Sequence, residues 1–291
     1  MFGKKEKSVF VNMNSMLTKA RNEKYAVPQF NINNLEWAKY ILEECECLKT
    51  PVILGVSEGA SKYMGGYNVV SKMVEALIKD LNISIPVCLH LDHGSSLEVC
   101  NSALQAGFSS VMIDASKYSL DDNIRITKSV VDIAKKYNAS VEAEIGHVGG
   151  TEDNITSEEL FARTDECIKM CSLVKLDALA PALGSVHGLY KGEPNLDFTR
   201  MLEISVKTSL PLVLHGGTGI PDDKILQSID CGICKINFNT ELQLAWKRHV
   251  DNFVSQNPNV YDPRKVIGSG EKAIKAVVRT KVTLLKSDNK A

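Results

Sequence analysis

The segment IPVCLHLDHGSSLEVCNSALQAGFSSVMIDAS, residues 85–116, contains the repeating unit that decides the fold. An apolar run leads through a polar HLDHGSS stretch into a segment with helical spacing. A second apolar run follows and again ends in an aspartate. Strands that are apolar on both faces and alternate with helices are typical of parallel sheets. The segment therefore predicts a strand, a helix and a second parallel strand.

The same unit recurs along the whole chain. The helical segments between the apolar runs often open with Asn, Ser or Asp, the residues preferred at helix N-caps. Eight strands are expected, at residues 25–32, 51–57, 85–92, 109–115, 139–146, 175–183, 211–216 and 233–239. This pattern predicts an α/β fold, a (β/α)₈ TIM barrel, with additional C-terminal helices at 240–256 and 270–286.

An open, doubly wound sheet is the alternative fold. Two observations favour a closed barrel: no GxGxxG follows the first strand, and polar residues end nearly every strand rather than gathering at one point. No linker, low-complexity tract or charge block divides the sequence, so residues 1–291 are expected to form a single barrel domain.

Composition restricts the classes of partner. The 34 basic residues nearly balance the 35 acidic ones, so no global field would recruit nucleic acid or an anionic membrane. Neither a signal peptide nor an uncharged apolar run of membrane-spanning length is present, which makes a cytoplasmic protein the expectation. The eight cysteines are scattered without a secretory signal and are interpreted as reduced thiols, including those of the CGIC at 231–234.

Three expected strands end in histidine followed by glycine, at His93, His187 and His215. In a barrel the carboxyl ends of all strands face one rim, so these side chains can meet there. Three neutral imidazoles with an open position are the ligand set of a catalytic zinc site. A single histidine at a strand end is more often structural, but three in the same context favour a metal.

Within HLDHGSS, strand alternation gives the polar residues different directions. His90 and Asp92 share one face and His93 takes the other until the strand ends. With His93 as the metal ligand, Asp92 is expected to face the substrate, and His90 is expected to be a supporting or core residue.

Carboxylates add to the expected rim. Asp114 ends the fourth strand, and Glu142 and Glu144 share a face of the fifth, which is costly inside a barrel unless a metal or hydrogen bonds offset it. Glu152 follows two glycines in a loop that could bring a carboxylate over bound substrate, although a solvated turn fits the composition equally well.

Anion binding is expected after the seventh and eighth strands. HGGTG (215–219) and NFNTE (237–241) each precede a helical segment. Backbone N–H groups together with the Thr218 and Thr240 hydroxyls could hold a phosphate there, where barrels often place one. Lys191 is a further candidate cation, or simply a solvated loop lysine.

With these residues identified, the chain resembles the class II, metal-dependent fructose-bisphosphate aldolases, in particular the shorter bacterial type shared with tagatose-bisphosphate aldolases. The resemblance covers nearly all of the chain after residue 10. It is carried by YAVPQFNINNLE, TPVILGVSEGA, CLHLDHGSS, SSVMIDAS, VEAEIG, VGGTED, LAPALGSVHGLYKGEPNLDF, LPLVLHGGTGIP, KINFNTE and YDPRKVIG.

The resemblance implies a glycolytic and gluconeogenic enzyme that reversibly cleaves fructose 1,6-bisphosphate into dihydroxyacetone phosphate and glyceraldehyde 3-phosphate. His93, His187 and His215 would bind Zn²⁺, Asp92 would transfer the proton, and Glu152 would act from its loop. Asp114 and Glu144 match a second metal site, for another divalent or a monovalent cation. Substrate-binding positions would be Asn31, Ser57, Gly188, Lys191, Gly216, Gly217, Thr218, Asn237, Phe238, Asn239 and Thr240.

The family further implies phosphorylated ketose and triose substrates and a homodimer or homotetramer. A tagatose-1,6-bisphosphate aldolase is the alternative, since the two substrates differ only in configuration at C4. The chain departs from the family pattern at His147, at KYSLDDN (117–123) and in its leading ten residues, which have no assigned role.

Other readings of the residues are open. A Schiff-base aldolase would use Lys235 or Lys175 as nucleophile. A zinc hydrolase barrel commonly pairs two histidines as H-x-H, whereas H-x-x-H stands here. A non-catalytic sugar-phosphate binding protein is the third alternative.

Overall fold

The barrel strands lie where the apolar runs predict them. The computed structural model describes residues 10–152, 155–157, 161–188, 190 and 192–291, with the backbone alone at 151, 152 and 155–157. Its closed parallel barrel has the strand order β1-β11-β10-β8-β5-β4-β3-β2. The barrel strands are β1 Val27–Asn31, β2 Val52–Val56, β3 Val87–Gly94, β4 Ser110–Ile113, β5 Ser140–Ile145, β8 Ala178–Pro181, β10 Leu212–Leu214 and β11 Ile233–Phe238. The predicted (β/α)₈ barrel is confirmed, and the open sheet is wrong.

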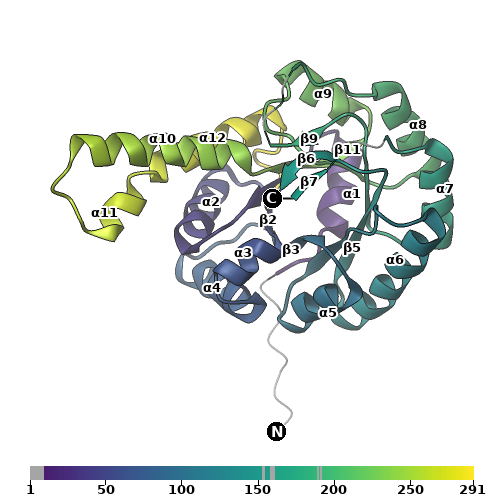
Figure 1. The fold of residues 1–291 in the computed structure, drawn as a ribbon, viewed down its shortest axis with the longest axis horizontal. Coiled ribbons are helices and arrows are strands. Elements are labelled where there is room, and N and C mark those ends of the chain that lie inside the picture. The colour runs from purple at the N-terminus through teal and green to yellow at the C-terminus, as the bar shows by residue number, and fades with distance from the viewer. Residues whose placement is uncertain (1–9, 153–154, 158–160, 189, 191) are drawn as a thin grey trace, which may run out of the picture.

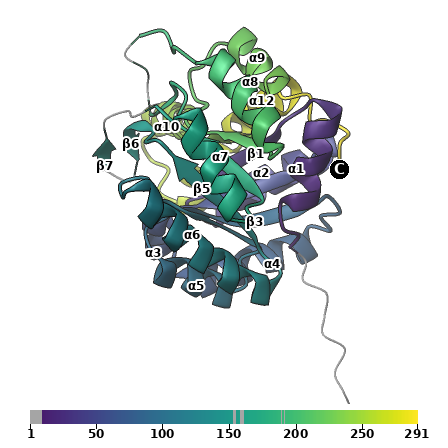
Figure 2. The ribbon, with the colours of Figure 1, turned by 90° about the vertical axis from the view of Figure 1, so that its right-hand side faces the viewer.

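Helices surround the barrel (Figures 1 and 2). The predicted N-caps Asn34 and Ser96 are observed, and Ser119 is a further N-cap two residues before the expected helix start at Asp121. Each of these three side chains accepts a hydrogen bond from a backbone N–H in the first turn. The helices are α1 Asn14–Glu23, α2 Leu35–Leu48, α3 Glu58–Tyr63, α4 Tyr67–Asp80, α5 Leu97–Gln105, α6 Leu120–Ala134 with the 3₁₀ turn Lys135–Tyr137, α7 Thr164–Leu173, α8 Phe198–Thr208, α9 Asp222–Asp230, α10 Thr240–Gln256, α11 Pro263–Gly268 and α12 Glu271–Leu284.

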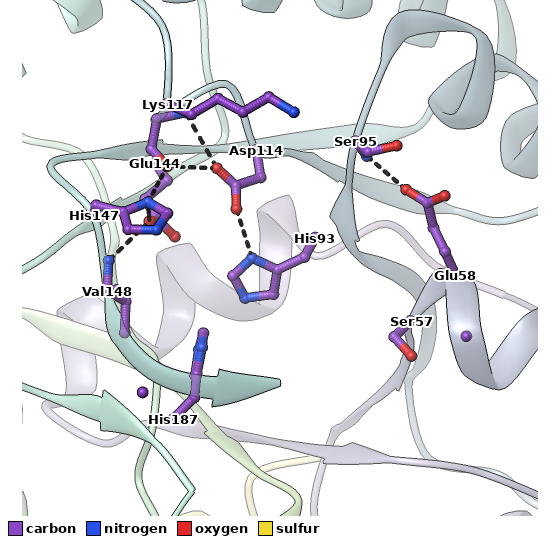
Figure 3. Close-up of a pocket in the computed structure, with 13 residues that line it drawn as sticks. Ser57, Glu58, His93, Ser95, Asp114, Lys117, Glu144, His147, Val148 and His187 are labelled. Carbon is purple, nitrogen blue, oxygen red and sulfur yellow. Dashed lines mark hydrogen bonds and ion pairs between the residues drawn. The ribbon is translucent and has the colours of Figure 1, made fainter. Parts of the chain in front are cut away.

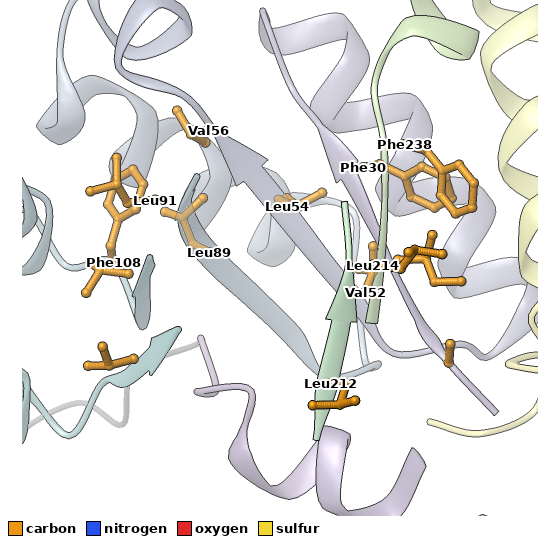
Figure 4. Close-up of a cluster of buried hydrophobic side chains, with 14 of the residues drawn as sticks. Phe30, Val52, Leu54, Val56, Leu89, Leu91, Phe108, Leu212, Leu214 and Phe238 are labelled. Carbon is orange, nitrogen blue, oxygen red and sulfur yellow. The ribbon is translucent and has the colours of Figure 1, made fainter. Parts of the chain in front are cut away.

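The main hydrophobic core fills the space between the strands and the helices. Outward-facing strand residues such as Leu54, Leu89 and Leu214 are fully buried against helical side chains (Figure 4). A second, smaller core lies inside the barrel at the amino ends of the strands. The N-terminal part of α1 closes this end of the barrel. The side chains there, Met13, Met16 and Leu17, pack on inward-facing strand residues.

A small sheet that the sequence pattern did not predict lies at the opposite end from α1 (Figure 2). It has the order β7-β6-β9, with β6 Gly149–Glu152, β7 Ile155–Ser157 and β9 Val186–His187. These strands are only two to four residues long, too short to give a periodic signal. The sheet nevertheless sets the position of His187. Within the described residues, no helix is both long and apolar enough to cross a bilayer.

Candidate active site

The three histidines that precede glycines meet at one end of the barrel, as predicted. The His93 ring lies 4.7 Å from the His215 ring and 4.9 Å from the His187 ring, centroid to centroid. One nitrogen from each of the three rings lies within 4.8 Å of the other two. Nδ1 of His215 is 2.9 Å from Nε2 of His93, so these two nitrogens face the same small volume.

The outer nitrogens of two of these rings contact carboxylates. Nδ1 of His93 lies 3.0 Å from Oδ2 of Asp114, and Nε2 of His215 lies 2.9 Å from Oε1 of Glu142. Metal-bound histidines almost always donate their second ring N–H in this way, which fixes the tautomer. Burial lowers the pKa of His187 and of His215, which favours the neutral imidazole that a metal requires. The donor set therefore fits a divalent metal ion.

His93 does not follow the strand alternation that HLDHGSS suggests. Its φ of 51° is left-handed, and the pairing of β3 with β4 is irregular between Leu91 and Gly94. A non-glycine residue in this region costs about 1–3 kcal/mol and is common at functional sites. This break in the pleat lets Asp92 and His93, although adjacent in sequence, both belong to the same end of the barrel.

Two glycines allow the small sheet to approach the barrel. A Cβ on Gly216 would lie 2.1 Å from the Val186 carbonyl oxygen, and one on Gly150 would lie 2.1 Å from that of His187. Both positions have positive φ, 65° and 101°. Any larger residue would push β9, and with it His187, away from His215.

Asp92 is 1 % exposed and is held by two amide side chains. Nδ2 of Asn31 donates to Oδ2 at 2.9 Å, and Nδ2 of Asn237 donates to Oδ1 at 3.4 Å. Burial acts to raise the pKa of Asp92, but nearby positive charge, including the Lys235 ammonium, holds it below its usual range. The structure thus keeps an ionised carboxylate beside the histidines, and Asn31 contacts that carboxylate directly.

A buried polar group lies beneath the histidines, and the sequence pattern indicated only part of it. Glu142 contacts His215 through one oxygen, and its other oxygen accepts a hydrogen bond from Nζ of Lys235 at 2.8 Å. His90 lies 3.8 Å from the same carboxylate and 2.8 Å from the Ser110 hydroxyl. Burial lowers the pKa of His90 to about 3, so His90 is a neutral supporting residue, as expected. The sequence signal for this group was the pattern VEAEIG, which places Glu142 and Glu144 on one face of a buried strand.

Asp114 and Glu144 form a second candidate cation group together with His93. Burial and the Asp114 carboxylate raise the pKa of Glu144 to about 8. His147, a departure from the family pattern, lies 2.8 Å from the Ser116 hydroxyl, which donates to Asp114 at 2.7 Å. His147 is therefore connected to this group through one serine.

A cavity of about 610 Å³ opens beside these residues (Figure 3). His93 lies between its two sides, and His187 lies below His147 and Val148 in this view. Asp114, Glu144, His147 and Lys117 line one side, and Ser57, Glu58 and Ser95 line the other. Its size matches the pockets that bind small molecules.

The residues predicted to bind an anion lie after β10 and β11. The Thr218 hydroxyl accepts a hydrogen bond from the Glu241 N–H at 3.3 Å, which joins the HGGTG loop to the start of α10. Gly217 donates to the Asn237 carbonyl at 3.0 Å. Oδ1 of Asn239 is buried without a partner among the described residues. A loop of small residues beside the N-terminus of a 17-residue helix suits a phosphate group.

Other predicted site residues are placed differently or are not described. The Phe238 side chain is fully buried and packs on Phe30 with ring centroids 6.0 Å apart, so only its backbone can face a ligand. Gly188 directly follows His187. Lys191 and the Glu152 side chain lie outside the described residues. Lys175 is exposed before the start of β8, at the other end of the barrel.

Comparison with known proteins assigns the family. Residues 11–290 match the model of the family "Fructose-bisphosphate aldolase class-II". The fructose-bisphosphate aldolases of Geobacillus stearothermophilus and Staphylococcus aureus are 54% and 51% identical to this chain over 282 residues. These alignments cover 97% of this chain and 98% and 99% of the relatives. The crystal structure of the YdjI aldolase from Escherichia coli K12 aligns with a TM-score of 0.85 at 31% identity over 97% of this chain and 99% of that chain.

A parallel barrel with its polar site at the carboxyl ends of the strands defines a TIM-barrel enzyme. The chain belongs to the class II fructose-bisphosphate aldolase family and is a lyase.

Proposed function

We propose that this protein reversibly cleaves fructose 1,6-bisphosphate into dihydroxyacetone phosphate and glyceraldehyde 3-phosphate at the end of the barrel where the three histidines meet. The observation that carries the proposal is the cluster of His93, His187 and His215 beside an ionised Asp92. The relatives named fructose-bisphosphate aldolase, at 51–54% identity, support this substrate over tagatose 1,6-bisphosphate.

His93, His187 and His215 would hold Zn²⁺, and Asp114 with Glu144 would hold a second cation. A bound divalent ion supplies a Lewis acid that stabilises negative charge at the C2 oxygen when the C3–C4 bond breaks. The neighbouring carboxylates Asp114 and Glu142 keep two of the imidazoles oriented for this purpose. A positive charge beside Glu144 would also offset the cost of placing two carboxylates close together.

Asp92 would move the proton of the reaction. Its carboxylate would accept the C4 hydroxyl proton during cleavage and return it during condensation. Asn31 and Asn237 donate to separate oxygens of Asp92, which orients it and favours the ionised form that a general base requires. Glu152, through the family resemblance, would handle the proton at C3.

The phosphate of the dihydroxyacetone half would lie against Gly216–Thr218 and the residues Asn237–Thr240 that lead into α10. Glycine at 217 allows close approach, since a Cβ there would lie 2.6 Å from an Ile236 methyl group. Backbone N–H groups at the helix start and the Thr218 hydroxyl supply the hydrogen bonds. Ser57, Gly188 and Lys191 would complete the substrate contacts.

A coupled assay tests the function directly. Activity on fructose 1,6-bisphosphate should fall at least about 100-fold in EDTA and return with Zn²⁺ or Co²⁺. Tagatose 1,6-bisphosphate should react more slowly. Chelator resistance combined with inactivation by borohydride plus substrate would instead establish Schiff-base chemistry. Lys235 could serve there only by leaving its buried contact with Glu142.

The family assignment also supports a single catalytic domain over residues 1–291, a homodimer or homotetramer, and a cytoplasmic location. Light scattering on the purified protein measures subunit number, and cell fractionation with antibody detection measures location. A monomer, or recovery with membranes, would contradict these two points.

A further inference from the structure

The inside of the barrel beneath the histidines contains a fully buried ion pair, Lys235 with Glu142. We infer that this pair positions the metal ligand His215: Glu142 fixes the ring so that Nδ1 faces His93, and Lys235 fixes Glu142. The inference rests on the metal-binding role proposed above for His215. Lys235 and Glu142 are positioning residues, because they act through His215.

The contacts form one continuous chain. Nζ of Lys235 lies 2.8 Å from Oε2 of Glu142, and Oε1 of Glu142 lies 2.9 Å from Nε2 of His215. Nδ1 of His215 in turn lies 2.9 Å from Nε2 of His93. The side chains of Lys235, Glu142 and His215 are all completely shielded from solvent. Water therefore does not compete for these contacts. Lys235 stays hydrogen-bonded to Glu142, and Glu142 stays in contact with His215.

The chemistry of the carboxylate decides the tautomer of His215. An ionised carboxylate only accepts hydrogen bonds, so Nε2 of His215 must carry the hydrogen that it donates to Glu142. The lone pair is then on Nδ1, the nitrogen that faces His93. Lys235 donates a hydrogen bond of 2.8 Å to the other oxygen of Glu142, which holds the carboxylate in the orientation that faces His215.

A purely stabilising role does not account for this pair. Removing two charges from water costs about as much as their attraction returns, and an apolar pair of similar volume is often equally stable. The position of Lys235 on β11 indicates instead that the pair serves the active site. Lys235 lies two residues before Asn237 on β11, and Asn237 donates to Asp92. One strand thus supports both the proton-transferring residue and, through Glu142, a metal ligand.

The test compares three double variants of the full-length protein. Glu142→Leu/Lys235→Met removes the pair without leaving a single buried charge. Glu142→Gln/Lys235→Met keeps an oxygen that can accept from His215. Glu43→Leu/Lys275→Met is the matched control, because it removes an ion pair of 2.7 Å between α2 and α12, on the outside of the barrel. The metal-free proteins are compared for thermal unfolding, for Zn²⁺ dissociation constant by chelator competition, and for Co²⁺ absorption spectrum.

We expect the Leu/Met variant to bind Zn²⁺ about 10- to 100-fold more weakly and to show an altered Co²⁺ spectrum. The Gln/Met variant should lose only about three- to tenfold, and the control should bind like wild type. Zn²⁺ affinity of the folded Leu/Met variant within about threefold of wild type would overturn the inference. If that variant does not fold, the Gln/Met variant decides: unchanged affinity overturns the inference, and a loss of threefold or more supports it.

Failure of the inference is distinguishable from failure of the proposed function. Wild type and control must each bind Zn²⁺ and lose activity in EDTA for the proposed function to stand. If both do so while the Leu/Met variant binds equally well, only the role of Lys235 and Glu142 is refuted.

Discussion

The two ends of the barrel are made by the same eight strands but contain opposite kinds of residue. At the amino ends, Met13, Met16 and Leu17 pack on small and apolar strand residues and exclude water. At the carboxyl ends, histidines, carboxylates and amides surround an open cavity. Apolar burial supplies stability at the first end, which allows the second to keep buried polar groups that are costly to fold. Substitutions at the two ends should therefore affect different properties.

The largest effect is expected for Asp92→Ala. Removal of a general base typically costs about 10²- to 10⁴-fold in rate, so kcat/KM should fall by that amount in a coupled cleavage assay. Activity within tenfold of wild type would show that Asp92 does not transfer the proton.

Asp177 offers the matched control at the other end of the barrel. Its carboxylate accepts hydrogen bonds from the Asn14 side chain at 2.7 Å and from the Val141 N–H at 2.8 Å. Asp177→Ala should lower the unfolding free energy by about 1–3 kcal/mol and leave the activity of the folded enzyme unchanged. Equal activity losses in the two variants would remove the distinction between the ends.

Leu17→Ala should mainly affect stability. Leu17 is completely buried inside the amino end of the barrel, and truncation of such a leucine costs about 2–5 kcal/mol. Urea unfolding measures the loss, while kcat/KM per folded molecule should stay the same. Leu202→Ala, on the exposed side of α8, is the control and should change stability by less than about 0.5 kcal/mol. A large loss of kcat/KM in Leu17→Ala under conditions where the protein is fully folded would show that the two ends of the barrel are coupled.

A smaller effect concerns the pH dependence of the metal-free protein. The folded pKa of Glu144 is raised to about 8, above the ordinary value of 4.5. Its stabilising contribution is therefore complete below pH 4.5 and is lost as pH rises through 8. Above about pH 7.5 the histidines of the unfolded chain are largely deprotonated, which separates their contribution from that of Glu144.

Between about pH 7.5 and 8.5 the unfolding free energy should accordingly fall by roughly 0.7 kcal/mol more in the wild type than in a variant without this carboxyl group. The fall should be smaller in Glu144→Gln, as measured by urea unfolding at each pH with EDTA present. Parallel pH profiles for the two proteins would contradict the assigned role of Glu144.

Sequence alone predicted all eight barrel strands and the meeting of the three histidines. Long apolar runs give a strong periodic signal, and a parallel barrel brings every carboxyl end to the same rim. It did not predict the small sheet or α1. The left-handed φ of His93 was also missed, because local propensity does not reveal a break in the pleat. Glu142 and Lys235 were noticed separately, yet nothing in their spacing of 93 residues indicates that they pair.

The sequence by itself determined the order of strands and helices, the residues that end each strand, and the membership of the family. These depend on periodicity and on residue type, which are local properties of the chain. Only the tertiary structure decided which nitrogen of His215 faces His93, that two amides hold Asp92, and that a buried lysine contacts the carboxylate beneath His215. Each of these depends on distances between residues far apart in the chain, which are fixed only when the barrel closes.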